Sequence, residues 1–327
     1  MNMDENLFEK RTDLTELKNK IDLIRAEIGK VIVGQTEMID LLIAALLSNG
    51  HVLIEGVPGV AKTLTAKLLA KTVSTGFSRI QFTPDLMPSD VLGTSVFNAK
   101  TSEFEFKPGP VFSNMILIDE INRSPAKTQS ALFEVMEERQ VSIDGKTYPM
   151  ETPFMVIATQ NPIEHEGTYR LPEAQIDRFL FKIQVNYPSL EEEIKIIESY
   201  HKHEHQLNTG LMESILSAEE LFSLQKQISR IHIEPHLVEY IARIIQQTRS
   251  HQALYLGGSP RASLAVMMGA KSFAAMSGRD FITPEDIRIC CQPALVHRIL
   301  MTPEKEIEGI KPEKVIEDIL AGIEVPR

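Results

Sequence analysis

Cysteine is nearly absent from this sequence, and the two cysteines that occur are neighbours. Cys290 and Cys291 follow one another directly, which makes a structural disulfide between them geometrically implausible. A chain that does not rely on disulfides is typical of a reducing compartment, so we expect a cytoplasmic protein. We interpret the pair as small apolar core side chains rather than as a redox site.

The sequence also lacks long apolar runs and an excess of basic residues. No apolar run reaches the roughly 20 residues that a membrane-spanning helix needs. The first residues lack the basic and apolar regions of a signal peptide, so neither secretion nor direct membrane insertion is expected. The chain has 45 acidic against 34 basic side chains and a formal charge of −11. This balance argues against a surface built mainly to neutralise nucleic acid, although it leaves room for a local basic patch.

The 327 residues are enough for two domains, each with its own core. Strand and helix patterns alternate up to residue 188, and only helical patterns follow. Strands are predicted at about 53–56, 80–82, 115–118, 154–158 and 179–185. Helices are predicted at about 13–28, 38–47, 63–71, 89–92, 125–138, 190–200, 217–230, 235–250, 261–276 and 284–291, with Ser124 as the N-cap and Pro125 as the first residue of the fifth. We therefore expect an α/β domain over 1–188 with a mainly parallel five-stranded sheet, and an all-α domain over 189–327.

The stretch 53–63 reads Leu-Ile-Glu-Gly-Val-Pro-Gly-Val-Ala-Lys-Thr and predicts a strand, a phosphate-binding loop and a helix start. A polyphosphate needs inward-facing N–H groups, a helix N-terminus, a lysine and a hydroxyl that can bind Mg²⁺. Gly56, Gly59, Lys62 and Thr63 have the required spacing. Ala61 stands where glycine is usual, and we expect it to fit because alanine is small and tolerates helical dihedral angles.

Polar residues end two of the other predicted strands. Asp119 and Glu120 follow four apolar residues, and this pair suits phosphoryl transfer, in which one carboxylate supports Mg²⁺ and the next activates water. Asn161 ends the next buried strand, where it fits either a ligand contact at the sheet edge or a turn. Arg178 and Arg261 on local sequence alone would form surface ion pairs.

Together these segments resemble the AAA+ ATPases, and within them the MoxR family of the helix-2-insert clade. The resemblance extends from Val33-Gly34-Gln35 to the helical tail and implies an AAA+ core followed by a helical lid. The motifs that carry it are Gly56-Val57-Pro58-Gly59-Val60-Ala61-Lys62-Thr63 (Walker A, in which Ala or Gly before Lys is accepted), Ile116-Leu117-Ile118-Asp119-Glu120-Ile121-Asn122-Arg123 (Walker B), Thr159-Gln160-Asn161-Pro162 (sensor 1), Leu171-Pro172-Glu173-Ala174-Gln175-Ile176-Asp177-Arg178-Phe179 (arginine-finger segment) and Gly258-Ser259-Pro260-Arg261 (sensor 2).

The resemblance implies an ATPase that uses Mg²⁺, held by Thr63 and Asp119. Arg178 would act on the nucleotide of a neighbouring subunit, and Arg123 is the alternative for that role. Arg261 would act on the nucleotide of its own subunit. The implied catalytic residues are Lys62, Asp119, Glu120, Asn161, Arg178 and Arg261. The implied nucleotide-binding residues are Gly34, Gln35, Gly56, Val57, Pro58, Gly59, Val60, Ala61, Lys62, Thr63, Leu64 and Arg261.

An arginine that acts on a neighbour requires a ring, and the family implies a homo-hexamer with chaperone-like activity that remodels or activates protein partners. The family's usual partners are proteins with von Willebrand factor A domains. Two alternatives stay open. One is a nucleic-acid-remodelling motor, which the acidic charge and the lack of an aromatic-interleaved basic run disfavour. The other is a nucleotide-gated assembly scaffold in which hydrolysis is incidental.

Two further segments predict β-hairpins, at 94–107 and at 141–148, the second around Asp144-Gly145. By resemblance they correspond to insertions of the clade and are expected to contact a substrate or partner. The run His201-Lys202-His203-Glu204-His205 suggests a metal site. It lacks a closed ligand set, however, and we favour a charged helix end.

Overall fold

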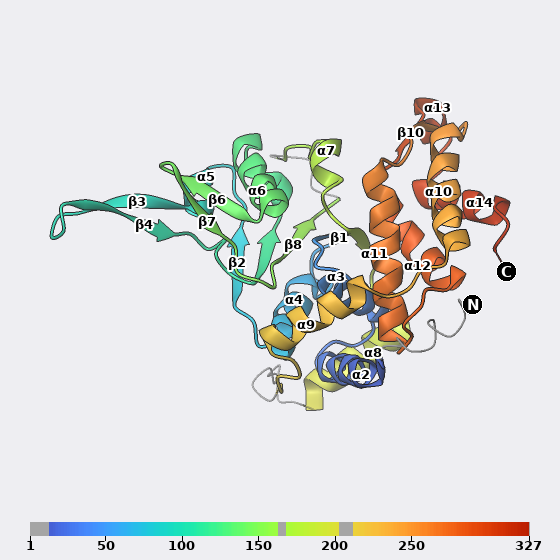
Figure 1. Cartoon of the computed structure of the whole chain (residues 1–327), viewed down its shortest axis with the longest axis horizontal. Coiled ribbons are helices and arrows are strands. Elements are labelled where there is room, and N and C mark those ends of the chain that lie inside the picture. The colour runs from blue at the N-terminus through green and yellow to red at the C-terminus, as the bar shows by residue number, and fades with distance from the viewer. Residues whose placement is uncertain (1–12, 163–167, 203–211, 327) are drawn as a thin grey trace, which may run out of the picture. The chain divides into compact units, whose positions relative to one another are not determined.

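The computed structural model describes residues 13–162, 168–202 and 212–326 (Figure 1). Contacts within the chain define two compact units. Of the described residues, those from Ile24 to Phe222 form one unit, and those up to Leu23 together with those from Ser223 onward form the other. Two helices, α2 (Thr15–Gly29) and α9 (Ala218–Ser229), cross these divisions. The domain boundary expected after residue 188 stays a prediction.

A parallel sheet lies at the centre of the first unit, in the strand order β2-β5-β8-β1-β9. The residues of β5 are all buried, as expected for a strand covered on both faces. The predicted parallel five-stranded sheet is therefore confirmed. Its strands are β1 (Val52–Gly56), β2 (Phe77–Gln81), β5 (Met115–Asp119), β8 (Met155–Gln160) and β9 (Phe181–Val185).

The prediction for β2 was wrong in its bounds, because the strand covers Phe77–Gln81 rather than 80–82. Only Ile80 is buried within it, so the edge strand lacks the apolar run that marks a central one. Phe82 lies beyond the strand, although its N–H still donates to the carbonyl of Asp119 at 2.9 Å. The shift matters because it brings Arg79 into the sheet.

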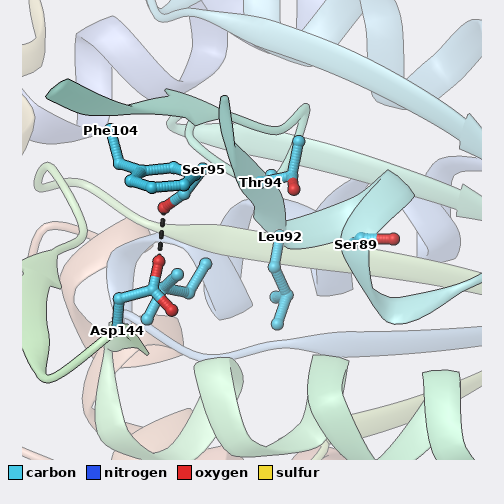
Figure 2. A pocket seen from close by; sticks show the side chains of 8 residues that line it. Ser89, Leu92, Thr94, Ser95, Phe104 and Asp144 are labelled. Atoms are coloured by element: carbon cyan, nitrogen blue, oxygen red, sulfur yellow. Dashed lines mark hydrogen bonds between the residues drawn. The ribbon is translucent and has the colours of Figure 1, made fainter. Parts of the chain in front are cut away.

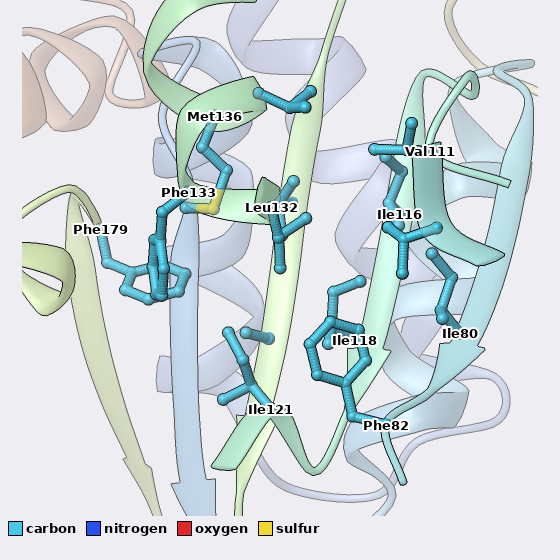
Figure 3. Close-up of a cluster of buried hydrophobic side chains, with 14 of the residues drawn as sticks. Ile80, Phe82, Val111, Ile116, Ile118, Ile121, Leu132, Phe133, Met136 and Phe179 are labelled. Atoms are coloured by element: carbon cyan, nitrogen blue, oxygen red, sulfur yellow. The ribbon is translucent and has the colours of Figure 1, made fainter. Parts of the chain in front are cut away.

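Helices cover the sheet and build the core of this unit. On one face, α6 contributes Leu132, Phe133 and Met136 to a buried cluster that also contains Ile116 and Ile118 of β5 (Figure 3). Alternate residues of a strand point to opposite faces, so Asp119 points to the other face, with Leu117. The helices of this unit after α2 are α3 (Thr36–Leu47), α4 (Lys62–Thr72), α5 (Pro88–Leu92), α6 (Ala126–Glu138), α7 (Glu173–Ile176) and α8 (Leu190–Lys202).

The expected cap of α6 was wrong. Ser124 and Pro125 are both extended, with ψ angles of 157° and 152°, and a 3₁₀ turn over Ile121–Arg123 precedes them. The helix begins at Ala126, and Pro125 holds the N-cap position without a side-chain cap. The Ser-Pro pattern was misleading because the extended conformation that proline imposes on the residue before it also suits a linker between two turns.

Both predicted hairpins are present in the first unit, where they project from the sheet (Figure 1). The first pairs β3 (Gly93–Asn98) with β4 (Glu103–Pro108), and the second pairs β6 (Gln140–Ile143) with β7 (Lys146–Pro149). Asp144 and Gly145 take φ angles of 52° and 75°, the left-handed conformation that this two-residue turn requires.

The second unit is built mainly of helices, and α11 packs against α12 in its core. A short antiparallel pairing of β10 (Leu254–Leu256) with β11 (Leu300–Met301) was not predicted, because strands this short have no readable alternation. Cys290 and Cys291 are free and buried, and burial raises the pKa of Cys291 to about 12. The remaining helices are α10 (Pro235–Ser250), α11 (Pro260–Met276), α12 (Pro284–Leu295), α13 (Pro303–Ile307) and α14 (Pro312–Gly322). Within the described part of the chain, no helix combines the length and apolarity needed to cross a bilayer.

Candidate nucleotide-binding site

The loop between β1 and α4 has the backbone of an anion cradle. Gly59 takes a φ of 88°, and a Cβ on Gly56 would lie 2.7 Å from the carbonyl oxygen of Val185. Both positions therefore need glycine. No side chain caps the N-terminus of α4, so its first N–H groups point into the loop without a side-chain acceptor at the cap. The ammonium of Lys62 donates to the carbonyl of Gly56 across the same loop.

Ala61 does not adopt the helical dihedral angles that we expected. As the N-cap of α4 it takes φ 61° and ψ 17°, in the left-handed region. This conformation costs a residue with a Cβ roughly 1–2 kcal/mol, a cost that glycine would avoid. The loop therefore keeps its shape with alanine, but under local backbone strain.

A hydroxyl and a carboxylate meet where the metal was expected. Thr63, in the first turn of α4, places its Oγ1 3.2 Å from Oδ1 of Asp119, and Asp119 is 6% exposed. The hydroxyl of Thr159 donates to the same oxygen at 3.3 Å. Oxygen donors of this kind are the ligands that Mg²⁺ prefers, and it commonly binds through only one or two of them together with phosphates. The donor set therefore fits the expected cation.

Glu120 is held in an unusual backbone conformation beside this pair. Its φ and ψ are 58° and 54°, left-handed for a residue with a Cβ, and its N–H donates to Oγ1 of Thr159 at 3.0 Å. Oε2 of Glu120 accepts a hydrogen bond from Gln81 at 2.7 Å and lies 3.2 Å from Nε of Arg123. Strained conformations of this kind concentrate at functional sites.

The edge strand β2 supplies two partners that sequence reasoning missed. Nε of Arg79 lies 2.6 Å from Oδ2 of Asp119, and Gln81 bonds Glu120 as described. Arg79 and Gln81 are two residues apart and so share one face of the strand. The available signal was this polar alternation, but the strand was predicted to begin after Arg79.

Asn161 and Arg178 lie in different surroundings. Asn161 follows β8, which lies between β5 and β1, so the carboxyl ends of the three strands bring it to the same edge as Asp119. Arg178 instead contacts the C-terminal half of α6, where Nη1 donates to the carbonyl of Phe133 and Nε lies 3.6 Å from Glu137.

The remaining expected nucleotide contacts lie in separate parts of the chain. Val57, Pro58 and Val60 lie in the loop, and Leu64 lies in the first turn of α4.

Gly34 takes a φ of 70°, and a Cβ there would lie 2.3 Å from Oε1 of Glu192, a neighbour that the sequence did not indicate. Nε2 of Gln35 donates to the carbonyl of Asn186 at 3.2 Å. Arg261 belongs to the other unit, where its N–H donates to Oγ of Ser259 at the start of α11.

The interpretation of the histidine-rich run as a charged helix end stays a prediction, because only His201 and Lys202 of the run are described. Among the residues that can be described, no group of three or more His, Cys, Asp or Glu side chains is arranged to hold a metal ion. His203, Glu204 and His205 lie outside the described residues.

Comparison with known proteins places the chain in a family. Residues 51–181 match the model of the ATPase family associated with various cellular activities, and residues 246–319 match an AAA lid domain. Chaperone MoxR1 of Mycobacterium tuberculosis is 46% identical over 310 residues, which are 92% of this chain and 81% of that protein. Protein YeaC of Bacillus subtilis is 47% identical over 299 residues, covering 91% of this chain and 92% of that protein.

More distant relatives and a solved structure agree with this assignment. Protein MoxR of Paracoccus denitrificans is 29% identical over 325 residues, which are 92% of this chain and 95% of that protein. A crystal structure of a Cytophaga hutchinsonii protein superposes with a TM-score of 0.87 at 43% identity, and covers 95% of this chain and 96% of its own. The chain belongs to the MoxR family of AAA+ ATPases, membership of which implies nucleotide binding and, in general terms, ATP hydrolysis.

Proposed function

We propose that this protein hydrolyses Mg²⁺-bound ATP and uses the cycle to remodel or activate protein partners as a hexameric ring. The supporting observation is that Thr63, at the start of α4, meets Asp119 at the carboxyl end of β5, with Glu120 next to it and a loop shaped for phosphates beside them. ATP and Mg²⁺ are the cofactors that this arrangement fits. We further propose a cytoplasmic location, which rests on the scarcity of cysteine.

Each residue of the site has a role that follows from its chemistry. Lys62 neutralises the outer phosphates, while Thr63 and Asp119 hold the metal. Mg²⁺, when bound, would neutralise charge that develops on the phosphoryl oxygens. Glu120 accepts a proton from the attacking water, and Asn161 orients that water or senses the γ-phosphate. Gly34 and Gln35 border the adenine.

Two arginines outside the phosphate loop complete the site, one within the subunit and one from the neighbouring subunit. Arg261 contacts the nucleotide of its own subunit, and Arg178 reaches the nucleotide of the neighbouring one, where it stabilises transition-state charge. Because Arg178 contacts Phe133 and Glu137 within its own chain, it must exchange these contacts on assembly. Arg123 contacts Glu120 and is the alternative for the trans role.

The two hairpins form the proposed contact surface for the partner. The turn of the second hairpin meets strand β3 of the first, where Oγ of Ser95 donates to Asp144 at 2.5 Å. Figure 2 shows this bond among the residues that line a cleft, whose volume is about 690 Å³. Phe104 lines the cleft and is 71% exposed. Aromatic side chains are enriched in surfaces that bind another chain, so Phe104 is a candidate contact for the partner.

The class of partner rests on relatives. One of them carries the name chaperone, which supports a protein substrate for this chain as well. The family resemblance further suggests partners with von Willebrand factor A domains. The net charge of −11 disfavours nucleic acid as the substrate.

Glu120→Gln tests the proposal, because it removes the water-activating carboxylate and keeps the phosphate loop. We expect ATP binding close to wild type and turnover reduced about 10²–10⁴-fold. Lys62→Ala should instead lose nucleotide affinity, and Arg243→Gln, which removes a remote charge exposed on α10, should change neither. Turnover near wild type in Glu120→Gln would exclude Glu120 from the proposed role.

The same variant separates the alternatives. A scaffold that only needs bound ATP would keep its full biological output with Glu120→Gln, whereas a remodelling enzyme would lose it. A nucleic-acid motor would show salt-sensitive DNA binding and an ATPase activity that DNA stimulates.

A further inference from the structure

Arg79 forms an ion pair with the carboxylate that we assign to the metal. Its Nε lies 2.6 Å from Oδ2 of Asp119, and the two side chains are 56% and 9% exposed. The arginine reaches this buried carboxylate from β2, the outermost strand of the sheet on that side. A carboxylate this buried needs a compensating charge or several hydrogen bonds, and Arg79 supplies the charge.

The orientation of Asp119 does not depend on Arg79. Oδ1 already accepts from the hydroxyls of Thr63 and Thr159, at 3.2 and 3.3 Å. The backbone of Asp119 lies at the buried end of β5, paired with Gln81 of β2. The distinctive contribution of Arg79 is therefore a positive charge on the other oxygen.

We propose that Arg79 competes with Mg²⁺ for Asp119 and thereby raises the Mg²⁺ concentration at which the nucleotide site fills. This inference rests on the proposed metal role of Asp119. A guanidinium on one carboxylate oxygen withdraws charge from the carboxylate and repels a divalent cation on the other. Because its side chain is more than half exposed, Arg79 can leave for solvent at small cost when the metal binds.

The size of the effect follows from the interaction that the metal displaces. A charged hydrogen bond contributes more than a neutral one, while the exposure of Arg79 reduces its strength through solvent screening. We expect the competition to change the half-saturating Mg²⁺ concentration about tenfold. Added salt should reduce the difference in half-saturating Mg²⁺ concentration between proteins with and without this arginine, because salt screens a charge that faces solvent.

The test is a Mg²⁺ titration of nucleotide binding, using a non-hydrolysable ATP analogue with a fluorescent group on its ribose. Arg79→Gln should reach half-saturation at about tenfold less Mg²⁺ than wild type. Arg79→Lys retains the charge and should stay within about threefold of wild type. Arg243→Gln removes a charge of an exposed helical pair and serves as the matched control. With EDTA present, Arg79→Gln should not bind the analogue more tightly than wild type.

Other results would overturn the inference. An unchanged or higher Mg²⁺ requirement in Arg79→Gln would mean that Arg79 does not compete with the metal. If Arg79→Gln bound the analogue more tightly than wild type in EDTA, Arg79 would act on the phosphates of the nucleotide and not on the metal. Arg79→Met, which keeps an aliphatic stem, replaces Arg79→Gln if circular dichroism shows that the latter does not fold. If the wild type binds the analogue equally well with and without Mg²⁺, the proposed metal role itself is wrong, a failure that is distinguishable from these.

Discussion

Acid should destabilise the parallel sheet through His51, the residue before β1. The imidazole is fully buried, and burial, together with the charge of Arg139, lowers its pKa from 6.5 to about 3. Nδ1 accepts from the N–H of Val156 at 3.0 Å, so the neutral ring carries its proton on Nε2, which donates to the carbonyl of Met136 at 3.2 Å. His51 thus joins α6 to β8 as a neutral group, and protonation would break the bond to Val156.

The magnitude follows from the difference between the two pKa values. As the pH falls below 6.5, the unfolded chain takes up a proton at this histidine while the folded chain does not, until pH about 3. The stabilisation is therefore complete above pH 6.5 and is lost progressively from pH 6.5 towards 3. At pH 5 the loss is about 2 kcal/mol, because each pH unit in this interval contributes about 1.4 kcal/mol.

Urea unfolding followed by far-UV circular dichroism at pH 7 and pH 5 measures this loss. His51→Gln keeps one donor and one acceptor but cannot be protonated, so its loss between the two pH values should be about 2 kcal/mol smaller than that of wild type. His201→Gln, an exposed histidine of α8, is the control and should behave as wild type. Equal pH dependence in His51→Gln and wild type would refute the reasoning.

Three further predictions concern the loop, the assembly and the hairpins. Ala61→Gly should raise the free energy of unfolding by about 1 kcal/mol by relieving the left-handed alanine, and no gain in chemical denaturation would contradict the strain. Arg178→Ala should leave nucleotide affinity nearly intact and remove the part of the ATPase rate per subunit that rises with protein concentration; a rate insensitive to dilution would exclude a trans role. Phe104→Ser should change stability by less than about 0.5 kcal/mol but weaken binding of reduced casein in fluorescence anisotropy, and undiminished binding would remove Phe104 from the partner surface.

Much of the fold could be predicted because its signals are local. The apolar run of β5 and the Asp144-Gly145 turn depend on a few consecutive residues, and both appear where expected. The wrong predictions concern segments whose conformation depends on the structure around them. Ser124-Pro125 has the composition of a helix start, but the 3₁₀ turn before it leaves both residues extended. In the edge strand β2 only Ile80 is buried, so the sequence there has no apolar run that would mark a strand.

The candidate site likewise has residues that a local sequence pattern predicts and residues that it does not. Spacing alone predicts the phosphate loop, since Gly56, Gly59 and Lys62 belong to one short segment whose chemistry requires that order. Arg79 is 40 residues from its partner Asp119, and Glu192 is farther still from Gly34 along the chain, so no local pattern connects them. Their roles depend on strand register and on the path of the chain, which composition does not encode.

Edge strands show why such partners escape a pattern-based prediction. Charged and polar side chains on an edge are commonly explained by solubility, because they discourage pairing with another chain. Arg79 and Gln81 fit that explanation in sequence, yet each bonds one of the two acidic residues at the end of the neighbouring strand. Because β2 pairs directly with β5, donors on one face of β2 reach both carboxylates. A polar pair with this two-residue spacing, on a strand beside a buried Asp-Glu end, therefore indicates partners of the acids as readily as a solvated edge.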